Sequence, residues 1–255
     1  MRDIARSALI ASGLLPSRYL WRNPFKIVEF DALTDGLDIR PTDAILDVGC
    51  GGGPQDLLLA RQAGRVVGID VSASEIERAR GLAEVYARGR ELEYRCTSIE
   101  SGGFRSGEFD KVVSFSVFEH IANRDIVLDV IADVLKPGGV LRMSVDSMAT
   151  LTDTALIAKH RADAFVLTYF KPAELRAMLE QRGFRDIHLW ALFRGPHALR
   201  EFEGAIERGH RYHRYRKFLP LLRLEIEEAT VPPGDIGLFL CVSAIKGSPP
   251  ASPRA

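Results

Sequence analysis

A glycine-rich segment and an acid that follows it are the residues best suited to bind a small ligand. Asp47-Val48-Gly49-Cys50-Gly51-Gly52-Gly53 stands at the end of a short apolar run. Glycines let the backbone turn sharply and let a ligand approach the main chain without an intervening Cβ. A helix starting near Pro54 would add free N–H groups and a partial positive charge. Asp70 ends the next apolar run, where an acid can accept hydrogen bonds from two ribose hydroxyls. The segment therefore predicts a ligand that contains a nucleoside.

The order of the glycines separates two classes of cofactor. A dinucleotide site requires the pattern G-x-G-x-x-G/A, and counting from Gly49 its last position is Pro54. The pattern acid-x-G-x-G-x-G fits instead, with Asp47 as the acid. A tight strand-to-helix turn would also explain the glycines, and a surface acid would explain Asp70, so other motifs have to decide.

Three further motifs follow the glycine loop in order: Phe109-Asp110-Lys111-Val112-Val113, Phe118-Glu119-His120-Ile121 and Leu135-Lys136-Pro137-Gly138-Gly139. With them, the chain resembles the class I S-adenosylmethionine (SAM)-dependent methyltransferases. The resemblance is strongest over residues 40–146 and extends less closely over 170–193 and 235–246. The local match is to small-molecule enzymes of the ubiquinone-biosynthesis and natural-product type, since strand four reads Ser114-Phe115-Ser116-Val117 and lacks the Asn/Asp-Pro-Pro-aromatic signature of DNA and RNA amino-methylases.

This resemblance implies SAM as the cofactor and gives each matching position a role. Gly49 and Gly51 would pass beneath the methionine part, Asp47 would orient that loop, and Asp70 would bind the ribose. Family members often carry an acid after the third strand that contacts adenine, but this region reads Cys96-Thr97-Ser98-Ile99. A hydroxyl or backbone group would have to replace that acid. The predicted cofactor-binding residues are Asp47, Gly49, Cys50, Gly51, Asp70, Val71, Thr97, Ser98, Ile99, Ser114 and Phe115.

Glu119 and His120 are the candidate catalytic residues. They follow the fourth strand, at the sheet edge where open α/β folds bind their ligands. His120 titrates near neutrality and could take a proton from a hydroxyl acceptor. Alternatively, the pair packs the loop and shapes the cofactor pocket. Asp146, His160 and Tyr169 are further pocket candidates, and residues 147–168 could form a lid. We expect no metal site.

Alternating strand and helix patterns predict the fold that positions these residues. Strands are expected at 44–48, 65–70, 92–95, 111–115, 140–145, 187–193 and 236–245. We therefore expect a doubly wound, Rossmann-like α/β sheet of seven strands, mostly parallel with an antiparallel last strand and helices on both faces. Residues 1–40 are expected to be helical, and 41–246 to form the SAM-binding domain with insertions at about 147–169 and 194–235. The tail 247–255 is expected to be disordered.

Composition narrows the partners and the compartment. The 255 residues carry 34 basic and 34 acidic side chains, so net charge gives no general attraction to nucleic acid or to an anionic membrane. Three distant cysteines without a CxxC pair argue against a disulfide framework and favour a reducing, cytoplasmic location. No apolar run approaches the roughly 20 residues of a membrane span. We expect a small-molecule acceptor and no nucleic acid partner, with a homodimer left open.

A basic stretch, residues 208–217, gives the strongest argument for another function. Its interleaved Arg and Tyr could bind RNA, an acidic substrate or a membrane surface. We favour a solvated helix face whose charge is balanced by flanking acids: Glu201, Glu203, Glu207, Glu225, Glu227 and Glu228. The expected function is therefore methyl transfer to O, N or C of a small molecule. An RNA or protein methyltransferase that docks through the basic stretch and a non-catalytic SAM-binding subunit are the alternatives.

Overall fold

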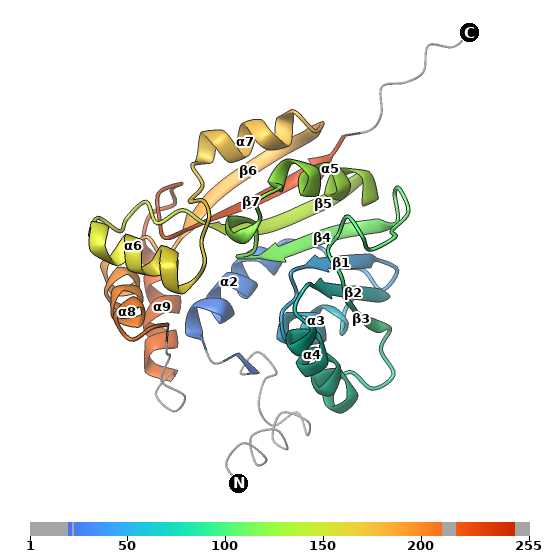
Figure 1. The fold of residues 1–255 in the computed structure, drawn as a ribbon, viewed down its shortest axis with the longest axis horizontal. Helices are drawn as coiled ribbons and strands as arrows, with labels where there is room; N and C mark the ends of the chain where they lie inside the picture. The colour runs from blue at the N-terminus through green and yellow to red at the C-terminus, as the bar shows by residue number, and fades with distance from the viewer. Residues whose placement is uncertain (1–19, 22, 211–217, 248–255) are drawn as a thin grey trace.

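The computed structural model describes residues 20–21, 23–210 and 218–247, and its centre is a seven-stranded sheet (Figure 1). The strand order is β3-β2-β1-β4-β5-β7-β6. All pairs from β3 to β5 are parallel, and β7 is antiparallel to both of its neighbours. This confirms the predicted doubly wound sheet. The strands are β1 Ala44–Val48, β2 Arg65–Asp70, β3 Leu92–Cys96, β4 Phe109–Phe115, β5 Leu135–Asp146, β6 Phe184–Leu192 and β7 Phe239–Lys246.

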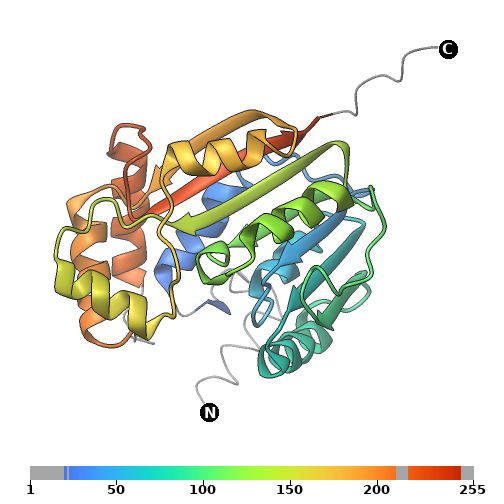
Figure 2. The ribbon, with the colours of Figure 1, turned by 45° about the horizontal axis from the view of Figure 1, so that its top comes forward.

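Helices cover both faces of this sheet, and one group gathers at its end (Figures 1 and 2). One core layer joins α2, α8 and α9 to the sheet, and the other joins α5 and α7. The group α6, α8 and α9 lies at the end to which the β4 and β5 arrows point in Figure 1. The helices are α2 Pro24–Thr34, α3 Pro54–Leu59, α4 Ala73–Tyr86, α5 Arg124–Val134, α6 Thr154–Asp163, α7 Pro172–Glu180, α8 Pro196–Glu207 and α9 Phe218–Thr230, with a 3-10 turn η2 at Phe118–His120.

The central strands are buried on both faces, which explains their continuous apolar sequence. Ile45 packs into the layer with α2, while its neighbour Leu46 packs into the layer with α5. Because successive side chains of a strand point to opposite faces, a run such as 44–48 needs apolar residues at nearly every position.

Local capping signals begin the helices close to the expected residues. The Ser72 side chain accepts a hydrogen bond from the Glu75 N–H at the start of α4, as the predicted capping box requires. Pro54 and Pro172 occupy first-turn positions of α3 and α7. Asn123 stands at the N-cap of α5, but its side chain donates to Glu100 and does not cap the helix.

The expectation of a helix over all of residues 1–40 is wrong at its C-terminal end. Helix α2 ends at Thr34, and Gly36 follows with φ +63°, a left-handed conformation that stops the helix. Residues 1–19 lie outside the described part of the chain. Within α2, Phe25 and Leu33 are almost fully buried, and the helix packs against α9 and β5.

The expected insertions carry helices α6, α8 and α9 above the edge of the sheet. Glu227 of α9 accepts hydrogen bonds from the N–H groups of His197 and Ala198, so it caps the start of α8. Glu228 accepts a hydrogen bond from the Phe193 N–H. These two acids therefore hold α9 against the start of α8 and the end of β6. Residues 211–217 of the basic stretch lie outside the described part. None of the helices in that part is long and apolar enough to cross a membrane.

Candidate functional site

A groove runs along the carboxyl ends of β1, β2, β3 and β4. It consists of two adjoining cavities of about 310 and 370 Å³. The two cavities share Gly49, Asp70, Val117 and His120, so they form one continuous space. This is the edge at which an open α/β sheet binds its ligands, and the combined size suits a ligand of nucleoside dimensions.

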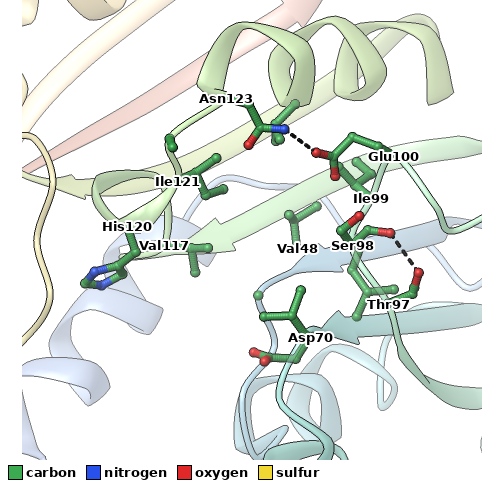
Figure 3. Close-up of a pocket in the computed structure, with 15 residues that line it drawn as sticks. Val48, Asp70, Thr97, Ser98, Ile99, Glu100, Val117, His120, Ile121 and Asn123 are labelled. Carbon is green, nitrogen blue, oxygen red and sulfur yellow. Dashed lines mark hydrogen bonds between the residues drawn. The ribbon is translucent and has the colours of Figure 1, made fainter.

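The first cavity brings together residues from three strand ends and from the turn after β4 (Figure 3). Asp70 and Val71 follow β2, and Thr97, Ser98 and Ile99 follow β3. Ile121 and Asn123 enter from the segment before α5. The wall is mainly apolar with a few polar groups, as expected where a flat ring is held between side chains.

The second cavity is lined by the glycine loop and by residues that the sequence did not point to. Gly49, Cys50, Gly51 and Phe115 were predicted. Trp21, Lys26, Gln55, Arg78 and Ser116 were not predicted, although they also line it. Lys26 and Trp21 come from the segment before β1, and only the tertiary fold brings them to the groove.

The glycine loop has the left-handed backbone that its glycines permit. Gly49 has φ +79° and Gly51 has φ +51°. A Cβ on Gly49 would lie 2.4 Å from Cγ2 of Val117, the residue shared by both cavities. A side chain there would thus collide with the wall of the groove. Gly49 is therefore required both because the backbone is left-handed and because no Cβ fits beside Val117.

Asp70 fixes the loop as well as facing the cavity. One carboxylate oxygen accepts the Gly51 N–H at 2.9 Å, and the other accepts the Ser72 N–H at 2.8 Å. A carboxylate offers about four lone-pair sites, so each oxygen can still accept a hydroxyl. Asp70 can therefore join the glycine loop, the start of α4 and a bound ribose.

Asp47 supports the glycine loop from behind the groove and lines neither cavity. It is fully buried, and its Oδ2 accepts a hydrogen bond from Gln55, whose Nε2 also donates to the Cys50 carbonyl oxygen. Burial raises the pKa of Asp47 to about 6, although hydrogen bonds from Asp56 and Gln55 oppose the shift. The loop-orienting contact thus runs through Gln55, whose own side chain does reach the groove.

An acid does follow the third strand, one residue beyond the stretch 96–99, where the sequence shows none. Glu100 lines the first cavity directly after Ile99, and its Oε1 accepts a hydrogen bond from Asn123 at 2.5 Å. The pKa of Glu100 lies below its usual value because its own backbone N–H donates to it, with help from Ser98 and Asn123. Reading one residue further along the chain would have found this carboxylate.

Ser114 does not border the groove, whereas its neighbour Phe115 does. The Ser114 hydroxyl is buried and donates to the Val48 carbonyl oxygen on the adjacent strand at 2.8 Å. Because side chains alternate along a strand, two consecutive residues of β4 cannot both face the same space.

The two candidate catalytic residues lie on opposite sides of the groove wall. His120 lines both cavities, its side chain is 39% exposed, and its Nδ1 lies 3.3 Å from the Phe165 carbonyl oxygen. Burial keeps the pKa of His120 below its ordinary value, so the ring is neutral at pH 7 and able to accept a proton. Glu119 is buried behind it and lines neither cavity, so the expectation that Glu119 contacts a substrate there is not met.

Asp146, His160 and Tyr169 also lie outside the walls of the two cavities. They form a buried chain instead, with His160 between the other two. The described residues contain no group of three or more His, Cys, Asp or Glu side chains arranged to hold a metal ion.

These features fit SAM. A cradle at Gly49 that any Cβ would fill, a carboxylate at Asp70 and an apolar slot between Val71, Ile99 and Ile121 match the loop, ribose and base positions of such a ligand. When bound, SAM would supply a methyl group on a sulfonium, an electrophile with a good leaving group.

Comparison with known proteins identifies related chains. Residues 46–143 match a family model described as a methyltransferase domain. A ubiquinone biosynthesis O-methyltransferase of Brucella anthropi is 35% identical over 164 residues, covering 58% of this chain and 63% of that protein. A second protein of that name, from Idiomarina loihiensis, is 27% identical and is covered over 73% of its length.

Solved structures share the fold. A putative methyltransferase of Bacillus halodurans has a TM-score of 0.62 at 20% identity, over 87% of this chain and all of that one. Geranyl diphosphate C-methyltransferase of Streptomyces coelicolor, solved with S-adenosyl-L-homocysteine, has a TM-score of 0.64 at 14% identity, over 87% of this chain and 79% of that one.

Residues 46–143 therefore match a methyltransferase domain, and the Rossmann-like fold is shared with solved methyltransferase structures. The chain is similar to the ubiquinone biosynthesis O-methyltransferases. It spans less than two thirds of the length of the Brucella anthropi relative.

Proposed function

We propose that the protein transfers the methyl group of SAM to a small-molecule acceptor. The single observation that supports this most strongly is the groove at Gly49–Gly51, where Asp70 fastens the loop and faces the cavity. In this proposal Gly49, Cys50 and Gly51 bind the methionine part and Asp70 binds the ribose. Val71, Thr97, Ser98, Ile99 and Glu100 surround the adenine.

The protein contributes positioning and the exclusion of water. Alignment of two reactants can supply roughly 7–11 kcal/mol in favourable systems, which is enough for much of this reaction. His120 lies where the two cavities meet. It can therefore accept a hydrogen bond from the hydroxyl of an acceptor molecule and take the hydroxyl proton during methyl transfer. An oxygen acceptor also agrees with the names of the curated relatives.

Calorimetry tests the cofactor directly. SAM and S-adenosylhomocysteine should bind, and NAD should not, because Pro54 occupies the position where a dinucleotide site requires Gly or Ala. NAD binding without heat from SAM would contradict the proposal. Turnover against a panel of hydroxyl, amine and carbon acceptors would then identify the methylated atom, and SAM binding without any turnover would favour a non-catalytic subunit.

We also propose a cytoplasmic location, because all three cysteines are free and two of them are buried. The expectation of no nucleic acid partner stays a prediction, which a gel shift with RNA would test, and sedimentation would decide whether a homodimer forms.

A further inference from the structure

A chain of buried polar side chains starts behind His120 and leads away from the groove. His120 Nε2 lies 3.8 Å from Glu119 Oε1. Turn η2 packs against β5, which brings the Glu119 and Asp146 carboxyls near enough for Asp146 to raise the pKa of Glu119, and Asp146 Oδ2 lies 3.6 Å from His160 Nε2. Glu119, Asp146 and His160 are at most 5% exposed. Two carboxyls this close and this buried hold a proton between them, because two adjacent buried anions would repel strongly.

The hydrogen bonds at the far end of the chain fix where His160 keeps its proton. The Tyr169 hydroxyl donates to the Ile157 carbonyl oxygen at 3.3 Å, which uses its only hydrogen. His160 Nδ1, 2.9 Å from the same hydroxyl, must therefore be the donor in that contact. Neutral His160 then presents a bare Nε2 to Asp146, which is an acceptor for a proton on the Asp146 carboxyl.

We propose that the Glu119–Asp146 pair takes up the proton that a hydroxyl acceptor releases, with His120 as the carrier. This rests on the proposed methyl transfer. The O–H bond of the acceptor breaks and its proton goes to His120 Nε2. His120 passes a proton to Glu119 Oε1, and Glu119 gives its own proton to Asp146. The pair begins with one proton and one negative charge and ends with two protons and no charge.

Charge balance supports this route. Methyl transfer turns a sulfonium cation into a neutral thioether, so a negative charge that disappears with it leaves the net charge of the buried site unchanged. Burial raises the pKa of Asp146 to about 7 and that of Glu119 well above its usual range, whereas burial lowers the pKa of His120. A proton on His120 therefore moves downhill to the pair.

Among the residues that the structure describes, two further charged groups act on the pair. Lys26 and Glu29 of α2 also face the pair, but Glu29 is bound to Lys26 at 2.8 Å and accepts hydrogen bonds from the hydroxyls of Ser116 and Ser144. Burial lowers the pKa of His160 to about 4, with further lowering from His210 and His120, so His160 does not hold the proton at neutral pH. Glu119 and Asp146 are thus positioning residues that act through His120.

Infrared titration of the resting protein, without cofactor, is the first test. We expect the carboxylic acid C=O band of Asp146 to disappear as pH rises through about 7, while that of Glu119, whose pKa is raised well above its usual range, persists. Asp146→Asn should remove the titrating band, and the control Glu180→Gln, an exposed acid on α7, should keep it. A wild-type spectrum in which no carboxylic acid band titrates near pH 7, or the same titrating band in Asp146→Asn, would overturn the proposal.

The pH dependence of methyl transfer is the second test. Single-turnover rates of the wild type should rise as pH increases through 7, because Asp146 must be ionised to receive the proton. Asp146→Asn and Glu119→Gln should each lower the rate by about 10²-fold and abolish that rise, since an amide cannot relay a proton. Calorimetry with S-adenosylhomocysteine checks that both variants still fold and bind.

The two tests separate the relay from the proposed function. Wild-type pH profiles in both active variants would overturn the relay alone. Absence of turnover and of SAM binding in the wild type would overturn the proposed function, whatever the infrared spectra show.

Discussion

Substitution of Gly49 by Ala tests the geometry of the groove most directly, because two separate costs can be assigned to it. The φ of +79° disfavours any residue with a Cβ by roughly 1–2 kcal/mol. The new methyl group would also lie 2.4 Å from Cγ2 and 2.6 Å from Cγ1 of Val117, an overlap that typically costs about 1–3 kcal/mol. We therefore expect Gly49→Ala to lower the free energy of unfolding by about 2–5 kcal/mol.

Gly103 provides a matched control. It has φ +66°, and nothing lies within 4 Å of the Cβ that Ala would add. Gly103→Ala should therefore show the backbone cost alone, about 1–2 kcal/mol. Urea denaturation of both variants, with S-adenosylhomocysteine affinity measured by calorimetry, separates the two costs.

A double-mutant cycle with Val117→Ala isolates the overlap. Removing both Val117 methyl groups should relieve the collision, so Gly49→Ala should cost about 1–3 kcal/mol less in the Val117→Ala background than in the wild type. Strictly additive effects, or a Gly49→Ala variant no less stable than Gly103→Ala, would show that the loop does not approach Val117 as the structure indicates.

Three further predictions concern ionisable side chains. Asp70→Asn should weaken SAM binding by about 10²-fold or more in calorimetry, because two charge-assisted hydrogen bonds of roughly 1.5–3 kcal/mol each are lost. It should also lower the melting temperature, because the Gly51 and Ser72 N–H groups lose a charged acceptor, an effect that a change at an unbonded surface acid would not have. His120→Ala should slow single-turnover methyl transfer to a hydroxyl acceptor by about 10²-fold with little change in SAM affinity, and equal rates for both proteins at every pH from about 6 to 9 would reduce His120 to a packing residue. For Asp146, the folded pKa of about 7 lies above the unfolded value of about 3.8, so its favourable contribution is complete below pH about 3.8 and is lost as pH rises through 7. Asp146→Asn should accordingly gain thermal stability relative to the wild type between pH about 4 and 7, and a difference in melting temperature that stays constant over this range would contradict the pKa assignment.

The sequence by itself determined the sheet and the loop. Short, mainly apolar runs such as 44–48 and 65–70 indicate strands buried on both faces, and their alternation with helices favours a parallel sheet. The glycine spacing at 49–53 and Asp70 at the next strand end located the groove, because local backbone geometry and the common edge of parallel strands fix both. These features depend on neighbours in the chain or on a periodic pattern.

Only the tertiary structure decided which polar side chains meet across distant elements. Lys26 reaches the groove because α2 packs against β5, and Glu119 meets Asp146 because η2 and the end of β5 lie together. Ser114 turns to β1 although Phe115 faces the groove, which depends on the phase of the strand. Such contacts are set by packing between segments that are far apart in sequence, and no spacing rule along the chain encodes them. The glycine loop is therefore visible in the sequence, whereas the buried carboxyl pair exists only once the sheet and its covering helices have assembled.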